Sequence, residues 1–514
     1  MSLARAYCVS LFGLGGKTIE VEADISSNLP NFVLVGLPDA SLSESTSRVR
    51  AACANSGLSL PARRITVNLS PASVPKHGSG FDLSIAVAAL AAAGALNARS
   101  VERFVHFGEL GLDGSLRPIG GILPMILAAK KAGFSRAVVP LANQNEAMLV
   151  EGVEIIGCTC LAEVARLHGA DIPINQREPE IFTAEVRPDE PESCMSEVFG
   201  QPELVEALKV AAAGRHHLLM VGPPGAGKTM LAERLPTILP QLTVEEALEV
   251  AAVRSIAHVE TITGLRTQPP FEAPHHSSSM VAMIGGGSGV PKPGLISLAH
   301  NGVLFLDETP EFSSQTLESL RQPLESGKVT INRASGSAWF PARFQLALAA
   351  NPCPCGNYSA KGNRCTCSHT QRARYLAKLS GPLLDRIDIR LDVRPASSGA
   401  IAVGRTSPGP TSAQIREEVL EARLRARRRL IETAWHANAE IPGAYLRKHL
   451  RPPTSATARL DAALARGHIS MRAYDRCLKV AWTSADLASR DHVTAEDVLY
   501  ALSLRGSVQQ EPTS

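Results

Sequence analysis

A glycine-rich loop followed by lysine and threonine carries the clearest chemistry in the sequence. The run Gly222-Pro223-Pro224-Gly225-Ala226-Gly227-Lys228-Thr229 matches the pattern G-x-x-x-x-G-K-[ST] and follows the apolar run Leu218–Val221. Glycines let backbone N–H groups turn toward phosphate oxygens, and a following helix, expected to begin near Met230, adds its positive end. Lys228 would reach the β- and γ-phosphates, and the Thr229 hydroxyl would bind Mg²⁺. The sequence therefore predicts an ATP site.

Two carboxylates and an amide complete the expected hydrolytic centre. Asp307 and Glu308 follow the apolar run Val303–Leu306, and Asn351 follows the run Phe344–Ala350. Parallel sheets bind ligands at the carboxyl ends of their strands. Asp307 would hold Mg²⁺, Glu308 would activate the attacking water, and Asn351 would help to hold that water. The alternative for Asn351 is a turn-forming role ahead of a proline.

Two arginines are candidates for contact with the γ-phosphate. Arg386 lies in the run Gly381-Pro-Leu-Leu-Asp-Arg-Ile-Asp388, and Arg472 lies near the start of an expected helix. An arginine supplied by a neighbouring subunit accelerates phosphoryl transfer by about 10³–10⁵. We assign that role to Arg386 and a sensing role in a helical lid to Arg472. The alternative for each is a surface salt bridge worth about 0–1 kcal/mol.

Four cysteines form a candidate metal site directly after Asn351. Cys353 and Cys355 lie on one side of a nine-residue loop, and Cys365 and Cys367 lie on the other. Four thiolates are a suitable ligand set for tetrahedral Zn²⁺, with His369 as a spare ligand. The alternative is a set of free thiols in a surface loop. The pair Cys158 and Cys160 has no second pair nearby and is expected to be structural.

Pattern and composition divide the chain into three units. The 514 residues include 52 Lys and Arg against 49 Asp and Glu, a net charge of +3 that identifies no nucleic-acid partner by itself. Strand and helix patterns predict an α/β unit over 1–170. A linker (171–195) precedes a parallel-sheet α/β core over 196–395 with helices on both faces. A second linker (396–411) precedes a helical unit over 412–510.

No export signal or membrane span is expected from the sequence. The longest charge-free apolar stretch, Leu83–Ala98, is shorter than the roughly 20 residues that a spanning helix needs, so we expect a buried helix. Ten cysteines in this length do not indicate a disulfide scaffold. These observations predict a cytoplasmic protein that does not contact a membrane.

Residues 196–505 resemble the AAA+ ATPases related to the magnesium-chelatase motor subunit. The matching stretches are Gly222–Thr229, Gly302–Glu308, Ala350–Gly356, Gly381–Asp388 and Ser470–Leu478. In that group an insert lies between the two nucleotide-binding motifs, and Pro269–Gly294 fits it, with His275 and His276 inside. The resemblance also implies a hairpin over Lys328–Arg343, with Arg333 at or near its tip.

The N-terminal unit resembles the Lon-protease-like domain, whose fold is related to ribosomal protein S5. The matching motifs are Val33–Asp39, Val67–Ala72, Pro75–Gly78 and Gly108–Gly121. Lon proteases use a Ser-Lys dyad, but here the serine position falls on Gly80, with Ser79 one residue early. The segment that should supply the lysine, Ile122–Leu127, has none. Because a serine without a base is a poor nucleophile, we expect an inactive peptidase fold.

Over nearly its whole length the chain is similar to the ComM (YifB-type) family, described as hexameric helicases that promote branch migration during natural transformation. The resemblance implies ATP and Mg²⁺ as cofactors, single-stranded or branched DNA and recombination proteins as partners, and a homohexameric ring. Lys292, Lys328 and Arg333 lie in inserts that would face the ring's pore and are the DNA-binding candidates. The arginine-rich stretch Glu417–Leu430 is expected to be solvated or to contact a subunit, with phosphate contact as the alternative. The alternative functions are a magnesium-chelatase-type motor and a protein-remodelling or regulatory ATPase.

Overall fold

The computed structural model describes residues 2–36, 42, 44–74, 76, 78–173, 193–257, 262–287, 291–333, 336–358 and 365–505. Several sequence predictions therefore fall partly outside the described residues. They are the motif residues 37–39, Pro75 and His77, most of the linker 171–195, part of the insert (288–290), two residues of the predicted hairpin (334–335), the centre of the cysteine loop (359–364) and the end of the helical unit (506–510).

The N-terminal unit is built on a sheet with the strand order β3-β4-β2-β1-β5-β8-β9. Its strands are β1 (Ser2–Phe12), β2 (Gly15–Ser26), β3 (Asn31–Val35), β4 (Arg64–Ser70), β5 (Val105–His106), β8 (Arg136–Pro140) and β9 (Glu154–Cys158). β1 and β2 form a long antiparallel hairpin. Buried and partly exposed residues alternate along β2, so one face of the sheet packs on the core.

Helices cover that sheet, and one of them is wholly enclosed. They include α2 (Ser45–Asn55), α3 (Asp82–Ala92), α5 (Ile122–Lys131) and α7 (Leu161–Leu167). Every residue of α3 is buried, as expected for a helix that is apolar on all sides. The apolar stretch that begins at Leu83 is therefore a core helix of this unit.

The second unit contains a five-stranded sheet with the order β11-β14-β17-β10-β18, and each neighbouring pair is parallel. The strands are β11 (Phe271–Glu272), β14 (Val303–Leu306), β17 (Gln345–Ala350), β10 (Leu218–Val221) and β18 (Ile389–Asp392). Successive side chains of β14 and β17 enter separate hydrophobic clusters on opposite faces, and both strands are buried throughout. The expected fold class, a P-loop core with helices on both faces of a parallel sheet, is confirmed.

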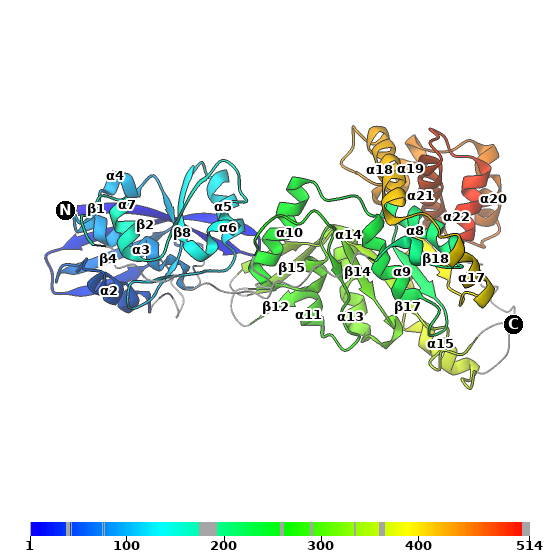
Figure 1. Cartoon of the computed structure of the whole chain (residues 1–514), viewed down its shortest axis with the longest axis horizontal. Helices are drawn as coiled ribbons and strands as arrows, with labels where there is room; N and C mark the ends of the chain where they lie inside the picture. Colours follow the sequence, from blue (N-terminus) through cyan, green and yellow to red (C-terminus); the bar gives the residue numbers. More distant parts are fainter. Residues whose placement is uncertain are drawn as a thin grey trace.

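The C-terminal helices are α17 (Ser398–Thr406), α18 (Ser412–Arg429), α19 (Gly443–His449), α20 (Thr454–Ala465), α21 (Met471–Leu487) and α22 (Ala495–Ser503). Of these, α18 and α21 pack on α8 (Pro202–Gly214) beside the sheet (Figure 1). The Thr411 side chain accepts a hydrogen bond from the Gln414 N–H, which begins α18 with a capping box. The stretch 396–411, expected as a linker, contains α17, in which no residue is buried.

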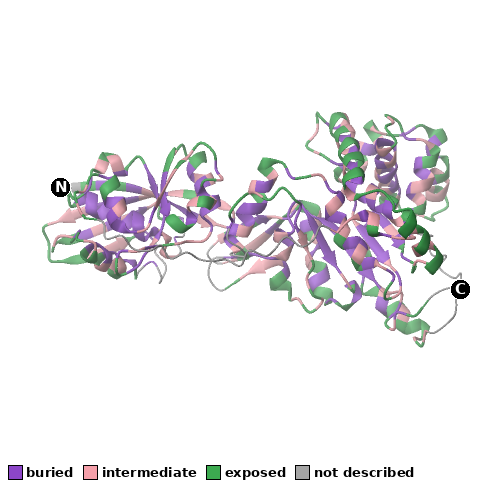
Figure 2. Ribbon diagram, in the orientation of Figure 1, coloured by how far each residue is buried: buried purple, intermediate pink, exposed green. Residues whose placement is uncertain are grey.

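Among the described residues, contacts between the N-terminal unit and the core include a helix, the segment that carries Ile262 and Leu265, and a hairpin. α10 (Val244–Ala257) packs on α5, and Ala251 and Ala252 join the core of the N-terminal unit. The hairpin is formed by β15 (Lys328–Arg333) and β16 (Gly336–Pro341). Leu14, in the turn between β1 and β2, donates its N–H to the Trp339 carbonyl at 3.4 Å. Figure 2 shows buried residues continuing from the sheets into the helices beside them, whereas the outer helix faces are exposed.

Shorter elements connect these layers. They are α4 (Ala98–Val101), β6 (Glu109–Leu110), β7 (Leu116–Arg117), α6 (Gln144–Ala147), α9 (Lys228–Arg234), α11 (Met280–Ile284), β12 (Gly285–Gly286), β13 (Lys292–Pro293), α12 (Leu295–Leu298), α13 (Ser314–Ser319), α14 (Arg321–Ser326), α15 (His369–Ala377) and α16 (Gly381–Leu384). α9 begins at Lys228, two residues before Met230, near which the sequence predicts its start. The positive φ of Gly227 (95°) turns the chain directly into the helix.

Candidate functional site

The glycine-rich loop leaves the carboxyl end of β10 under tight steric control. The Gly222 N–H donates to the Ala350 carbonyl at 3.1 Å, which joins the loop to β17. A Cβ atom on Gly222 would lie 2.1 Å from the Val393 carbonyl oxygen, so only glycine fits there. Gly225 and Gly227 have φ values of 75° and 95°, which favour glycine. The loop geometry therefore depends on three glycines for two separate reasons.

Lys228 lies inside the loop, with its ammonium group held by oxygen atoms. Its Nζ donates to the carbonyls of Gly222 at 2.8 Å and Pro223 at 3.0 Å, and to Oδ1 of Asn351 at 3.1 Å. Burial lowers the pKa of Lys228, and the carboxylates of the two acidic residues after β14 oppose that shift. The structure thus brings together Lys228 and Asn351, which the sequence placed at the ends of two different strands.

Thr229 and Asp307 meet at the same edge of the sheet. The Thr229 hydroxyl donates to Oδ2 of Asp307 at 2.6 Å, and Oδ1 of Asp307 accepts the Glu308 N–H at 2.8 Å. A hydroxyl oxygen beside a carboxylate is a hard-oxygen ligand pair of the kind that Mg²⁺ prefers. The two residues predicted to bind Mg²⁺ therefore form a donor set that fits this ion.

Glu308 has a backbone conformation that is uncommon for a residue with a side chain. Its φ is 48°, in the left-handed region. The next residue, Thr309, fixes this turn, because its hydroxyl lies 2.8 Å from the Leu306 carbonyl and 2.9 Å from that of Ala349. The Glu308 side chain is 52% exposed, so its carboxylate is open to solvent beyond Asp307. Strained backbone of this kind is frequent at functional sites.

His276 lies beside Glu308 and was assigned no role from the sequence. Its Nδ1 is 3.6 Å from Oε2 of Glu308, and its ring lies against that of His275 with centroids 4.1 Å apart. Both histidines follow β11, the strand next to β14, so their position at the carboxyl edge follows from the sheet order. The available signal was a histidine pair after a short strand, which sequence spacing alone could not place near Glu308.

The four cysteine sulfurs converge at the end of β17. Sγ of Cys353 is 3.4 Å from Sγ of Cys355 and 3.6 Å from that of Cys365, and all four Sγ atoms, including that of Cys367, lie within 4.8 Å of one another. A backbone hydrogen bond from Asn357 lowers the pKa of the Cys355 thiol to about 6. Burial raises the pKa of Cys353 to about 11. The cluster is a candidate metal centre adjoining the nucleotide site.

Arg386 and Arg472 lie away from Lys228 and Asp307 of their own chain. β10 and β18 run parallel with Leu218 opposite Ile389, so Arg386 precedes the edge at which strands begin, whereas the glycine-rich loop follows the other edge. The Arg386 guanidinium contacts Glu325 and donates to the Pro382 carbonyl. Arg472 donates to Oδ2 of Asp385 at 2.9 Å, and its side chain is 76% exposed.

A buried polar network ties the same segment to the helical unit. Asp388 is 1% exposed and accepts hydrogen bonds from Arg476 and from Nδ1 of His216 at 3.0 Å. Nε2 of His216 lies 2.8 Å from the Thr483 hydroxyl on α21. Burial opposes ionisation of Asp388, but the charges and hydrogen bonds of Arg476 and His216 lower its pKa well below the usual range. This network is not evident from the sequence, because its members come from three distant segments.

The remaining basic candidates occupy different settings. Lys292 in β13 and Lys328 at the start of β15 are exposed. Arg333, at the end of β15, donates to the Gly287 carbonyl and so joins the hairpin to the insert. In the arginine-rich helix, Arg423 donates to the Ala212 carbonyl and Arg429 pairs with Asp486. These two arginines therefore bind the helix to its own subunit.

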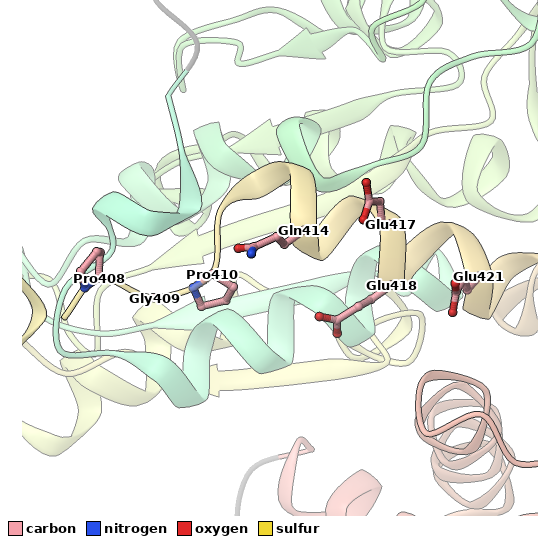
Figure 3. Close-up of a pocket in the computed structure, with 7 residues that line it drawn as sticks. All are labelled: Pro408, Gly409, Pro410, Gln414, Glu417, Glu418 and Glu421. Carbon is pink, nitrogen blue, oxygen red and sulfur yellow. The ribbon is translucent and has the colours of Figure 1, made fainter.

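A surface pocket along α18 lies apart from this chemistry (Figure 3). It is lined by Pro408, Gly409, Pro410, Gln414, Glu417, Glu418 and Glu421. Its charged lining residues are all glutamates, which repel phosphate groups. The candidate nucleotide site is therefore the loop edge of the five-stranded sheet and not this pocket.

Comparisons with known proteins cover nearly the whole chain. Family models match "Magnesium chelatase, subunit ChlI" over residues 194–401, "Subunit ChlI of Mg-chelatase" over 21–143 and "Magnesium chelatase, subunit ChlI C-terminal" over 409–505. Competence protein ComM of Haemophilus influenzae is 41% identical over 515 residues, covering 99% of this chain and 98% of that protein. Protein YifB of Escherichia coli is 40% identical over 507 residues, covering 98% and 97%.

Two further findings concern a partial match to a Lon protease and the search for membrane-spanning helices. A Lon protease of Mycolicibacterium smegmatis is 32% identical over 145 residues, which is 27% of this chain and 18% of that enzyme. Within the part of the chain that the structure describes, no helix has the length and apolar character needed to cross a membrane.

Proposed function

Because the chain belongs to the family of competence protein ComM and YifB, with an AAA+ core like that of magnesium chelatase subunit ChlI, we propose that it is an ATP-driven DNA motor. The proposed activity is that of a hexameric helicase that promotes branch migration in recombination during natural transformation. The observation that carries the ATPase part is the meeting of Lys228, Thr229, Asp307 and Asn351 at one edge of the sheet.

The proposed hydrolysis uses the chain's own groups in order. The N–H groups of Gly225–Lys228 and the first turn of α9 bind the phosphates, and Lys228 exchanges its carbonyl partners for phosphate oxygens. Thr229 and Asp307 would hold Mg²⁺, which when bound would neutralise phosphate charge. Glu308 accepts a proton from the attacking water, and the Asn351 amide helps to orient that water.

Arg386 is proposed to act on the nucleotide of a neighbouring subunit. Its position at the opposite edge of the sheet from the loop supports this, because a head-to-tail ring would bring that edge to the next subunit's site. The side chain would have to leave Glu325 to reach a phosphate. Arg472 lies next to Arg386 through Asp385, so the same reasoning assigns it to the same interface.

Mixing Arg386→Ala with Glu308→Gln subunits tests this arrangement. Each variant alone should be inactive, and mixed rings should regain ATPase activity where an intact Arg386 faces an intact Glu308. Mixtures that stay inactive at every ratio would remove support for action between subunits.

DNA contact is proposed for Lys292, Lys328 and Arg333. The two lysines are exposed, and the insert and hairpin that carry these residues are joined through Arg333 and Gly287. Replacing one phosphate-binding lysine should reduce the slope of log K against log salt by about 0.7 for single strands. Lys448→Ala, an exposed lysine on α19, is the matched control and should leave the slope unchanged.

The first experiment measures ATP hydrolysis with and without single-stranded and four-way-junction DNA at two salt concentrations. Lys228→Ala is the inactive control. Stimulation by DNA that weakens at high salt supports the motor. Activity that is indifferent to every DNA would contradict it, and would favour the second candidate, a motor for a chelatase or protein partner, for which the family-model matches are the supporting observation.

The N-terminal unit (1–170) is proposed to lack peptidase activity. Ser79 donates its hydroxyl to Glu109, and the Lys76 ammonium is buried against the carbonyls of Gly36 at 2.9 Å and Pro71 at 2.5 Å. Lys76 is therefore held by backbone acceptors, and the described contacts of Ser79 include no lysine. Casein digestion should be the same for the wild-type protein and for Ser79→Ala. If Ser79→Ala digests casein more slowly than the wild type, the proposal is contradicted.

A further inference from the structure

We propose that Cys353, Cys355, Cys365 and Cys367 bind one Zn²⁺, and that this metal knuckle holds the glycine-rich loop in its nucleotide-binding shape. The mechanical link is the contact between Gly356 of the knuckle and Pro224 of the loop. The second half of the inference rests on the proposed nucleotide site, whereas the metal site stands on its own geometry.

The spacing of the sulfurs fits a tetrahedral metal. Three Sγ–Sγ distances, among Cys353, Cys355 and Cys365, are 3.4, 3.6 and 3.7 Å. A Zn–S bond of about 2.3 Å places the sulfurs of a regular tetrahedron about 3.8 Å apart. A disulfide would need about 2.05 Å, and all four cysteines are free. The thiols therefore surround a point that matches a structural zinc ion.

A second Cys-x-Cys pair in the chain provides an internal comparison. Cys158 and Cys160 have the same spacing, and both are buried free thiols. They belong to no group of three or more metal-binding side chains within the described residues. Cys-x-Cys spacing alone therefore does not make a metal site. The site at residues 353–367 forms because a second Cys-x-Cys pair lies close to the first.

The knuckle touches the nucleotide site at two points. Asn351, two residues before Cys353, accepts a hydrogen bond from Lys228. Gly356, one residue after Cys355, has a φ of 74° and lies so close to Pro224 that an added Cβ would be 2.6 Å from its Cδ. The Gly356 N–H donates to the Cys353 carbonyl at 2.9 Å, which closes the turn between the two contacts. Fixing Cys353 and Cys355 on a metal thus fixes both.

The other pair anchors the knuckle to the following helix. Arg372 of α15 donates to the Cys367 carbonyl at 3.3 Å, and its guanidinium lies 4.3 Å from the ring centroid of Tyr358. Ser368 caps α15 directly after Cys367. A metal shared by the two pairs would therefore join the end of β17 to α15. Gly356 would then contact Pro224 from a segment that is fixed at both ends.

Metal content is the first test. Full-length protein purified without added chelator should contain about one zinc per chain, and Cys353→Ser with Cys365→Ser should remove it. Cys158→Ser with Cys160→Ser is the matched control and should retain it. Replacement of zinc by Co²⁺ should give the absorption of a tetrahedral thiolate site. Absence of zinc and of Co²⁺ binding in the wild-type protein would overturn the metal site.

Nucleotide affinity is the second test, measured by equilibrium binding of a fluorescent ATP analogue. The zinc-free variant should bind about tenfold more weakly, the scale of effect seen when groups supporting a site are removed. Gly356→Ala should weaken binding while keeping its zinc, and adding Pro224→Ala should restore part of the loss. Full zinc loss with unchanged affinity would overturn the brace.

The same measurements separate this inference from the proposed function. Wild-type protein that binds zinc but no nucleotide would refute the ATP site, and with it the brace, and leave the metal site standing. If the wild-type protein binds nucleotide and Gly356→Ala binds it with the same affinity, the brace is refuted and the ATP site stands.

Discussion

Replacing Asp388 by alanine should detach the helical unit from the core more than any surface substitution. The carboxylate is 1% exposed and accepts hydrogen bonds from His216, which is fully buried, and from Arg476, whose side chain is 20% exposed. Without it, the imidazole and the guanidinium lose their shared acceptor. Removing one partner of a buried ion pair costs about 3–5 kcal/mol. For a unit of about 150–250 residues this corresponds to a fall in Tm of about 6–20 °C.

The assay is hydrogen exchange of the amides of α21, combined with thermal unfolding. Asp385→Ala is the matched control. Asp385 is three residues before Asp388 and pairs with Arg472, but both side chains of that pair are exposed. An exposed pair is worth about 0–1 kcal/mol. In Asp388→Ala the free energy of exchange of the α21 amides should fall by the full loss of about 3–5 kcal/mol. In Asp385→Ala their exchange should remain near that of the wild type. Equal losses in the two variants would refute the reasoning from burial.

The pH dependence gives this prediction a sign. The folded-state pKa of Asp388 is depressed, so its contribution is complete above the unfolded pKa of about 3.9 and is lost as pH falls toward the lower folded value. Wild-type protein should therefore lose this stability only in strong acid, and Asp388→Ala should lack that part of the acid transition.

Three further outcomes follow from the site and the N-terminal unit. Gly222→Ala should weaken binding of the ATP analogue by about 1–3 kcal/mol, because its Cβ would lie 2.1 Å from a carbonyl oxygen, whereas Gly264→Ala, with open space around it, should not. His276→Ala should raise DNA-independent ATPase up to about fivefold by freeing Glu308 from an exposed pair worth about 0–1 kcal/mol; an unchanged rate would show that the pair restrains nothing. Burial lowers the pKa of His168 to about 4, so His168 should make the urea stability of the N-terminal unit fall by about 1.4 kcal/mol per pH unit as pH drops from about 6.5 to about 4. His168→Gln should reduce the slope, and the neighbouring His106, whose pKa burial also lowers, should account for what remains.

Local signals made the nucleotide loop predictable from sequence. A buried strand, a glycine turn, Lys228 and a helix are consecutive in the chain, so their geometry needs no distant contact. Asp307 and Asn351 could be predicted for a related reason, because each follows a buried strand and parallel strands end at one edge. The thiol cluster was recognisable from spacing, but the contact of Gly356 with Pro224 was not, since it depends on how two loops meet.

Long-range contacts account for what the sequence did not predict. The side chain of Arg386 turns toward Glu325, and His276 reaches Glu308 from a neighbouring strand. The strand β1 is also not evident from the sequence. Its inward residues Ala4 and Ala6 are small and give a weak alternating signal, although both are buried in the sheet.

The packing of the N-terminal unit against the β15–β16 hairpin has a thermodynamic consequence. A Cβ atom on Gly13 would lie 2.6 Å from the Trp339 carbonyl oxygen, and Phe12 packs in one cluster with Ala338 and Phe340. The hairpin cannot shift without moving the β1–β2 turn or breaking these contacts. Any molecule that binds the N-terminal unit more tightly in one hairpin position must therefore bias that position by the same free energy, and a load on the hairpin must change that molecule's affinity in return.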